Sequence, residues 1–453
     1  MLLGRRKTLL VEIATGPLLF LLVAGVYLAN RTVVQRSDSL WTLHIAMSLV
    51  REGNLDLNEY ASVIPPGDLR VLDINGRLVS HYPLGAPILV APALLVLHPV
   101  VRLIRHVDLF QDVLLNEDPF VGLASDIETA LASLIAALTA VVIYYSMRLV
   151  LNRRGAVLLT LVFAFGTAAW STASRGLWQH GPSMLMLALA LYFALRARDE
   201  PRWIQFAGLP LAFSYVCRPT NAVPVLIFTI FVFVCYRPYA LRYCLWASLI
   251  AIPFLLESMH LYGTFLQPYY LPRHGGGQPL ILDALIGNLV SPARGLFIYS
   301  PIFLLCGYGV FIWWRDGRFG SLEIVVTTIV IGHWLAISVF AHWPQWWGGA
   351  SYGPRFFADV SPFLIYMLAP VVQLWQSATG RVAVPGIALF VLLFAVSAFM
   401  HYRGATQWAT WQWSEAQPGL HEDVDVDPSR LWDWSDPQFL AGMEWRLTQP
   451  ASQ

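Results

Sequence analysis

Long apolar runs, repeated from one end of the chain to the other, constrain this sequence more than any other feature. A run of about 20 apolar residues is long enough to cross the hydrocarbon core of a bilayer as a helix. One such run ends near Asn30, and ten more follow at 127–147, 155–172, 178–195, 204–217, 220–236, 243–262, 297–314, 321–341, 357–375 and 382–400. The sequence therefore predicts an all-α polytopic membrane protein with about 11 transmembrane helices.

The composition agrees and excludes other classes of protein. Hydrophobic residues make up 57% of the chain and charged residues only 13%, whereas soluble domains carry about 25% charged residues. A net charge of +1 without a basic tract excludes a nucleic-acid-binding protein. The 4 cysteines all lie within apolar runs, where they are expected to be small core residues and not a disulfide framework.

Basic residues indicate the orientation. Arg5, Arg6 and Lys7 precede the first run, which predicts a cytoplasmic N-terminus. An odd number of spans then gives an extracytoplasmic C-terminus. Every connection predicted to be cytoplasmic is short and basic, as the positive-inside rule requires; together these connections hold Arg148, Arg153, Arg154, Arg196, Arg198, Arg202, Arg237, Arg242, Arg315, Arg318 and Arg381.

Most of the remaining chain is expected on the outer face. Residues 31–126 form a first outer loop, in which the proline-rich apolar segment 83–101 is predicted to be a broken helix lying in the interface and not a twelfth span. We divide the chain into a transmembrane domain, 1–402, and a Trp-rich outer tail, 403–453. Most of the chain outside the membrane is thus expected on one face, as an enzyme that works at the outer surface of the membrane would need.

The first outer loop carries an acid and a histidine that suit chemistry. Asp38 is expected at the membrane boundary beside an amphipathic stretch, where a carboxylate can act as a general base. The alternative is a helix N-cap formed by Asp38 or Ser39. His81 and Tyr82 stand in the motif Ser80-His81-Tyr82-Pro83-Leu84-Gly85. His81 can donate or accept a proton at neutral pH, but it is equally an ordinary loop histidine.

Several arginines interrupt or border apolar runs. Arg175 and His180 lie in a short outer turn, Arg218 separates two runs, and Arg294 lies in the turn Pro292-Ala293-Arg294-Gly295. An arginine at membrane depth is expensive and is a candidate for function. The alternative is a side chain that reaches the interface or pairs with a structural acid.

The loop at 342–355 combines three tryptophans, a glycine pair and an arginine, and Asp359 follows it. Aromatic faces pack on sugar rings, and glycine lets the backbone approach closely. Trp347, Tyr352, Arg355 and Asp359 are therefore predicted to bind a sugar substrate. An interfacial aromatic belt is the alternative.

Other motifs are weak or missing. The tail segment 421–427 alternates acids but lacks the glycine and the distal glutamate of an EF-hand, so a solvated acidic strand is favoured over a calcium site. The sequence contains no Walker loop, HExxH, CxxC or GxSxG. Nucleotide hydrolysis, zinc proteolysis and classical serine hydrolysis therefore have no support.

Taken together, the pattern resembles the GT-C superfamily of integral membrane glycosyltransferases. The nearest groups are the protein O-mannosyltransferases, the bacterial lipid A aminoarabinose transferases and uncharacterised bacterial membrane proteins. The likeness covers the whole chain in topology. In sequence it rests on Asp38, the His81–Gly85 motif, the Arg218-Pro219-Thr220 break, Arg294, and the Trp-Gly-Gly loop that ends at Arg355.

The resemblance implies transfer of a sugar from a polyprenyl-phosphate donor to an extracytoplasmic acceptor, which is a glycan, a lipid or a protein. The enzyme would be a multi-pass protein of the bacterial cytoplasmic membrane, with its site facing outward and inversion at the sugar. Asp38 matches the family's first-loop acid. No cofactor is certain. A divalent metal is left open because many members carry paired acids, but Ser39 after Asp38 favours a single base.

Two other functions remain open at this stage. A transporter or lipid flippase would need ionisable groups near mid-membrane, and His333 is the clearest residue of that kind. A non-enzymatic assembly protein would need no cluster of acidic and arginine side chains.

Overall fold

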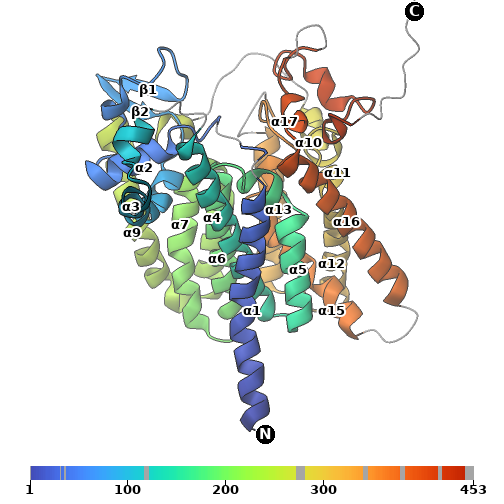
Figure 1. Ribbon diagram of the computed structural model, residues 1–453. Coiled ribbons are helices and arrows are strands. Elements are labelled where there is room, and N and C mark those ends of the chain that lie inside the picture. The colour runs from blue at the N-terminus through green and yellow to red at the C-terminus, as the bar shows by residue number, and fades with distance from the viewer. Residues whose placement is uncertain are drawn as a thin grey trace, which may run out of the picture. The chain divides into compact units, whose positions relative to one another are not determined.

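The computed structural model describes residues 2–30, 32–34, 37–116, 122–271, 281–339, 345–377, 383–416 and 421–443. Arg36, Arg381 and His342 to Pro344 lie outside the described residues. Apart from one β-hairpin, the regular structure is helical (Figure 1). The helices are α1 (Leu2–Ala29), α2 (Thr42–Arg51), α3 (Gly85–Arg105), α4 (Leu123–Arg148), α5 (Arg153–Phe165), α6 (His180–Arg196), α7 (Gly208–Cys217), α8 (Ala222–Cys235), α9 (Ala240–Tyr262), α10 (Ile281–Val290), α11 (Leu296–Tyr299), α12 (Leu305–Arg315), α13 (Ser321–Val339), α14 (Ser361–Met367), α15 (Ala369–Ser377), α16 (Ala383–Thr406) and α17 (Ala409–Gln412).

The ends of these helices follow from local sequence. Asn152 caps α5, because its side chain accepts from the backbone N–H of Gly155 at 3.0 Å. Gly263 ends α9 in the left-handed conformation, with φ of 69°. The hairpin pairs β1 (Val71–Ile74) with β2 (Arg77–Ser80) antiparallel, and its two-residue turn uses positive φ at both Asn75 and Gly76.

The helices confirm the predicted all-α class and its membrane character. Five segments among the described residues are long and apolar enough to cross a bilayer: Gly85–Arg105, Leu123–Arg148, Arg237–Tyr262, Ser321–Val339 and Val384–Thr406. Four of them coincide with predicted spans, and Gly85–Arg105 is α3. Of the other predicted spans, the first lies in α1, a helix of 28 residues, and the helices in the rest are shorter or interrupted.

Contacts divide the chain into two compact units. Unit 1 comprises residues 1–33, 143–172 and 273–453, and unit 2 comprises residues 34–142 and 173–272. The tail thus belongs to unit 1, and most of the first outer loop belongs to unit 2. The predicted boundary at 402 and 403 does not coincide with this division, because the tail packs into unit 1.

In unit 2, α7 packs against both α6 and α9 (Figure 1). A Cβ atom on Gly208 would lie 2.3 Å from the carbonyl oxygen of Tyr243, so glycine allows α7 and α9 to approach closely. The outward face of α9 leaves large apolar side chains exposed, such as Leu245 and Leu249. An apolar face of this kind is what a lipid-facing helix presents.

The Arg-rich turns gather at one end of each unit. In unit 2, the 3₁₀ turn Pro201–Ala207 contains Arg202, which pairs with Glu200, and the turn contacts both α6 and the turn Arg237–Tyr239. In unit 1, Arg318 donates to Gln373 at 2.6 Å, and Gln373 donates to the Val150 carbonyl at 2.6 Å.

The segment predicted to be a broken helix is continuous, and that part of the prediction is wrong. Pro92 and Pro99 both lie inside α3, and Pro87 lies in its first turn, where a missing N–H costs little. Leu84, just before α3, and Phe110, just after it, nevertheless belong to the same buried apolar cluster. By length and hydropathy alone, α3 could also cross a bilayer.

Candidate functional site

Asp38 is half-buried in the turn that precedes α2. The Tyr82 hydroxyl donates to Asp38 Oδ1 at 3.0 Å, and the hydroxyl of the next residue, Ser39, donates to Glu128. The residue that caps α2 is Trp41, and the helix has no side-chain capping hydrogen bond at this end. The alternative of a helix N-cap is therefore wrong for both Asp38 and Ser39.

An aromatic group surrounds the Tyr82 hydroxyl. The rings of His81, Tyr82 and Tyr269 lie with their centroids 5.6 to 5.7 Å apart in all three pairs. The backbone N–H of Tyr82 donates to the Ser80 hydroxyl at 3.0 Å, which fixes the chain as it leaves β2. These contacts hold the Tyr82 ring so that its hydroxyl points to Asp38.

Glu128 connects the Asp38 turn to the predicted outer turn at 175–180. Its side chain is fully buried and accepts from the backbone N–H of Leu177 at 3.0 Å as well as from Ser39. Arg175, in the same turn, is also fully buried, and its Nε donates to the Ser174 hydroxyl at 3.0 Å.

Arg218 and His180 form a buried pair. Arg218 has an extended backbone, as expected before a proline, and its side chain is 2% exposed. Its Nη1 donates to His180 Nδ1 at 2.6 Å. Because a guanidinium only donates, this nitrogen of His180 accepts, which assigns a neutral ring with its proton on Nε2. The Trp178 ring stacks on His180 at 6.3 Å.

Two chains of contacts bring these residues to the same end of unit 2. One runs from Asp38 through Ser39 and Glu128 to Leu177. The other runs through the Tyr82 motif to Gly85, which contacts Cys217, the neighbour of Arg218 in sequence. Unit 2 thus gathers six of the predicted site residues: Asp38, His81, Tyr82, Arg175, His180 and Arg218.

The other five predicted residues lie in unit 1, where Arg294 is the centre of a buried network. Its Nε donates to the Trp347 carbonyl at 2.9 Å, its Nη1 to Gln438 at 2.6 Å, and its Nη2 to the Gly349 carbonyl at 3.0 Å and the Ser414 hydroxyl at 3.2 Å. Burial lowers the pKa of Arg294 to about 10, so the group stays charged at neutral pH. Each guanidinium nitrogen already has a protein acceptor, and this favours a structural role over the predicted binding of substrate.

The predicted sugar-binding loop is packed in a similar way. Trp347 is 6% exposed, and its Nε1 donates to Asp425 of the tail at 2.6 Å. Tyr352 is fully buried and donates to the Met400 carbonyl at 2.6 Å. Arg355 donates to the Gly348 carbonyl at 2.6 Å, and Asp359 is fully buried. Apart from the half-buried Arg355, these side chains lie in the interior, whereas a sugar-binding surface needs exposed aromatic faces.

The acids of the tail are used in local turns. Asp423 accepts from the backbone N–H of Asp425 at 2.8 Å, and Asp427 accepts from the N–H of Ser429 at 3.2 Å. Within the described part of the chain, no three His, Cys, Asp or Glu side chains are grouped closely enough to hold a metal ion. The segment thus forms local turns, whereas the sequence pattern favoured a solvated acidic strand.

Comparison with known proteins adds no relative: no family model matches the chain, and no curated protein matches it. What can be stated of its class comes from the molecule itself. It is a helical membrane protein with a group of acidic, basic and aromatic side chains at one end of unit 2.

Proposed function

We propose that the protein is a GT-C-type membrane glycosyltransferase, which transfers a sugar from a polyprenyl-phosphate donor to an extracytoplasmic acceptor. The observation that carries this proposal lies in unit 2. There, a carboxylate held by a tyrosine, Asp38, shares one end of the unit with two buried guanidinium groups, Arg175 and Arg218.

The arginines suit the donor. Its phosphate is the leaving group, and a guanidinium binds a phosphate with paired, charge-assisted hydrogen bonds. Such bonds are strongest where water is excluded, and both Arg175 and Arg218 are almost completely buried. We favour these two over Arg294 because they belong to the same unit as Asp38, whereas Arg294 belongs to unit 1.

Asp38 suits the acceptor. In this proposal its carboxylate takes the proton from the acceptor hydroxyl while the acceptor oxygen bonds to the anomeric carbon. The bond from that carbon to the phosphate oxygen breaks on the opposite face, and the configuration inverts. The bond from Tyr82 fixes the rotation of the carboxylate.

The arrangement of unit 2 supports an outward-facing site. In unit 2 the Arg-rich turns lie at the end of α6 and the start of α9, whereas His180 and Arg218 lie at the start of α6 and the end of α7. By the positive-inside rule the site then faces away from the cytoplasm. We accordingly propose a multi-pass protein of the bacterial cytoplasmic membrane with about 11 spans and a cytoplasmic N-terminus.

The proposal is tested with purified protein in liposomes and a panel of radiolabelled polyprenyl-phosphate sugars. The wild type is expected to release or transfer sugar, and Asp38→Asn to lose about a hundredfold or more of that rate. Asp126→Asn is the matched control, because it removes an exposed acid near the start of α4. Full activity of Asp38→Asn, with elution from a sizing column unchanged, refutes the assignment of Asp38.

The transporter alternative has less support. The Nε2 of His333 lies 2.9 Å from the Phe356 carbonyl oxygen, and His333 is fully buried in α13. This contact connects α13 to the turn Arg355–Phe357, which is a packing role. In the liposome assay, movement of the labelled lipid without sugar release would favour a transporter.

A further inference from the structure

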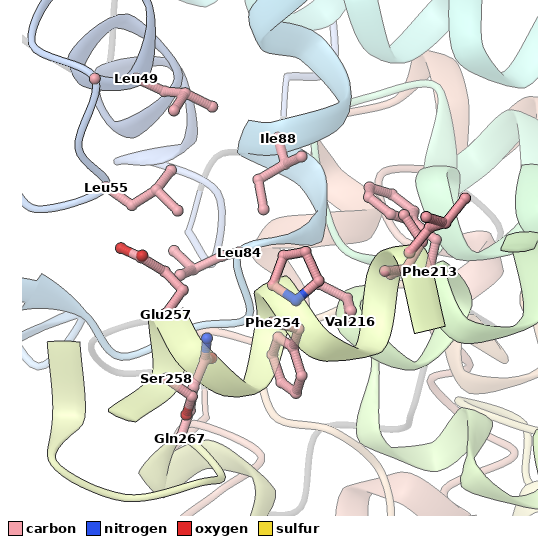
Figure 2. Close-up of a pocket in the computed structure, with 14 residues that line it drawn as sticks. Leu49, Leu55, Leu84, Ile88, Phe213, Val216, Phe254, Glu257, Ser258 and Gln267 are labelled. Carbon is pink, nitrogen blue, oxygen red and sulfur yellow. The ribbon is translucent and has the colours of Figure 1, made fainter. Parts of the chain in front are cut away.

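Unit 2 contains a cavity of about 300 Å³ that the proposed transfer reaction does not use. It lies between α3, α7 and α9, together with the chain around Gly53 and Gln267. Apolar side chains line most of it, and Figure 2 shows Leu55, Ile88 and Phe254 around the space. The volume is at the lower limit of ordinary ligand pockets in proteins.

One corner of this cavity is polar. Gln267 is 1% exposed, and neither its amide oxygen nor its amide nitrogen has a hydrogen-bond partner among the residues that the structure describes. The hydroxyl of Ser258 is equally buried and lacks a partner within the same described part of the chain. Figure 2 shows both side chains on the same side of the cavity as Glu257. Buried polar groups are nearly always hydrogen-bonded, so this corner is suited to a ligand.

We propose that the cavity binds a lipid with one apolar chain that ends in an uncharged hydroxyl group, such as a long-chain alcohol. A hydroxyl both donates and accepts, and the Gln267 amide and the Ser258 hydroxyl offer the complementary groups. The Glu257 carboxylate accepts from a hydroxyl but repels an anion, and none of the described residues that line the cavity is Arg or Lys. The site therefore discriminates against phosphate and carboxylate head groups.

The surroundings provide a route from the bilayer. Leu249 lines the cavity and is also 58% exposed on the outward face of α9. Ile252 and Leu256, on the same helix, are exposed as well. A chain dissolved in the membrane thus reaches the cavity without crossing water.

The cavity is a different site from the Asp38 group. Gln267 lies just before the 3₁₀ turn Pro268–Tyr270, in which Tyr269 packs on His81 and Tyr82. The Gln267 side chain faces the cavity instead. Binding of the alcohol does not depend on glycosyl transfer.

The test uses the full chain in phosphatidylcholine nanodiscs and three photoreactive probes. The probes share one diazirine-bearing chain that ends in a hydroxyl, a methyl or a carboxylate group. The alcohol is expected to label the cavity wall at Leu84, Val216 and Phe254, about three- to tenfold more strongly than the other two, as one or two hydrogen bonds to a neutral group would produce. Equal labelling by all three probes, or no labelling of the wall, overturns the proposal.

Two variants and a control make the test specific. Gln267→Leu is expected to abolish the preference for the alcohol, whereas Gln111→Leu, the same change at an exposed position, leaves it intact. An unchanged preference in Gln267→Leu overturns the proposal. Val216→Phe fills the cavity and is expected to block labelling by all three probes. If Gln267→Leu fails to fold, the outcome depends on Val216→Phe. Labelling of that variant at the same level as the wild type overturns the proposal.

Discussion

Tyr82 is connected to the proposed chemistry by a single hydroxyl group. Because that hydroxyl donates to Asp38 Oδ1, we expect Tyr82→Phe to leave the carboxylate in place but free to rotate. Loss of one hydrogen bond to a charged group corresponds to about 1.5–3 kcal/mol. The rate constant kcat should therefore fall about tenfold or more, while KM for the donor changes little. Steady-state kinetics measure both; a change in KM alone would mean that Tyr82 binds substrate and does not position Asp38.

Asp68 supplies a pH dependence that does not involve catalysis. Its carboxylate is only 2% exposed and accepts from Trp41 Nε1 at 3.0 Å and from Arg70 Nε at 2.7 Å. Burial acts to raise the pKa of Asp68, but the hydrogen bonds from Arg70 and Trp41 outweigh it and hold this pKa below its ordinary value.

A lowered pKa stabilises the folded state above the ordinary pKa of the group, and this stabilisation is lost as the pH falls through the folded value. We therefore expect Asp68→Asn to lower the melting temperature Tm at neutral pH. The difference from wild type should shrink below about pH 4. Thermal unfolding in detergent at several pH values measures it. A difference that is constant with pH would assign the effect to packing.

Sequence reasoning identified the residue types at the proposed site better than their roles. Asp38 and Arg218 stood out because charge is costly at the membrane boundary. Tyr269 gave no signal, because an aromatic residue in an outer loop is common. Arg294 also attracted attention as a charge, but whether such a charge meets a ligand or protein carbonyls depends on contacts across 144 residues of sequence. No local pattern contains that information.

Among the helices, α3 depends on one glycine at its first position. A Cβ atom on Gly85 would lie 2.6 Å from the Cys217 sulfur and 2.7 Å from the Cys217 Cα. Because one of these atoms is backbone, Gly85→Ala must push α3 away from α7. We expect a loss of stability of about 1–3 kcal/mol, together with lower activity because Arg218 follows Cys217.

The matched control for this change is Gly307→Ala in α12. A Cβ atom there meets nothing within 4 Å, so alanine should be neutral or slightly stabilising. Thermal unfolding and the liposome assay compare the two variants. Wild-type stability in Gly85→Ala would contradict the close approach of α3 and α7.

Helices were predicted correctly from continuous apolar runs. The prediction of a broken helix at 83–101 was wrong because it counted the prolines without considering their positions in the helix. In α3, Pro87 lies in the first turn, where its missing N–H breaks no helical hydrogen bond. Pro92 and Pro99 leave carbonyl groups without a helical donor, which an exposed helix tolerates.

For the molecule as a whole, the central expectation is that basic turns and the proposed site open to opposite sides of the membrane. After the 4 native cysteines are replaced by alanine, Leu69→Cys marks the outer loop, and Arg202→Cys and Arg318→Cys mark the two groups of basic turns. In intact cells a membrane-impermeant thiol reagent should label only Leu69→Cys. The other two should react after the membrane is opened. Labelling of Leu69→Cys and Arg202→Cys from the same side would overturn the topology.

The burial of Arg294 has a consequence for biosynthesis. Two of its acceptors, Ser414 and Gln438, are translated long after the arginine itself. Until they emerge from the ribosome, unit 1 holds a cation whose partners are incomplete, and burying it then would be costly. Final closure of unit 1 must therefore wait for the last part of the polypeptide, and a chain cut short before Gln438 should be a substrate for quality-control proteases.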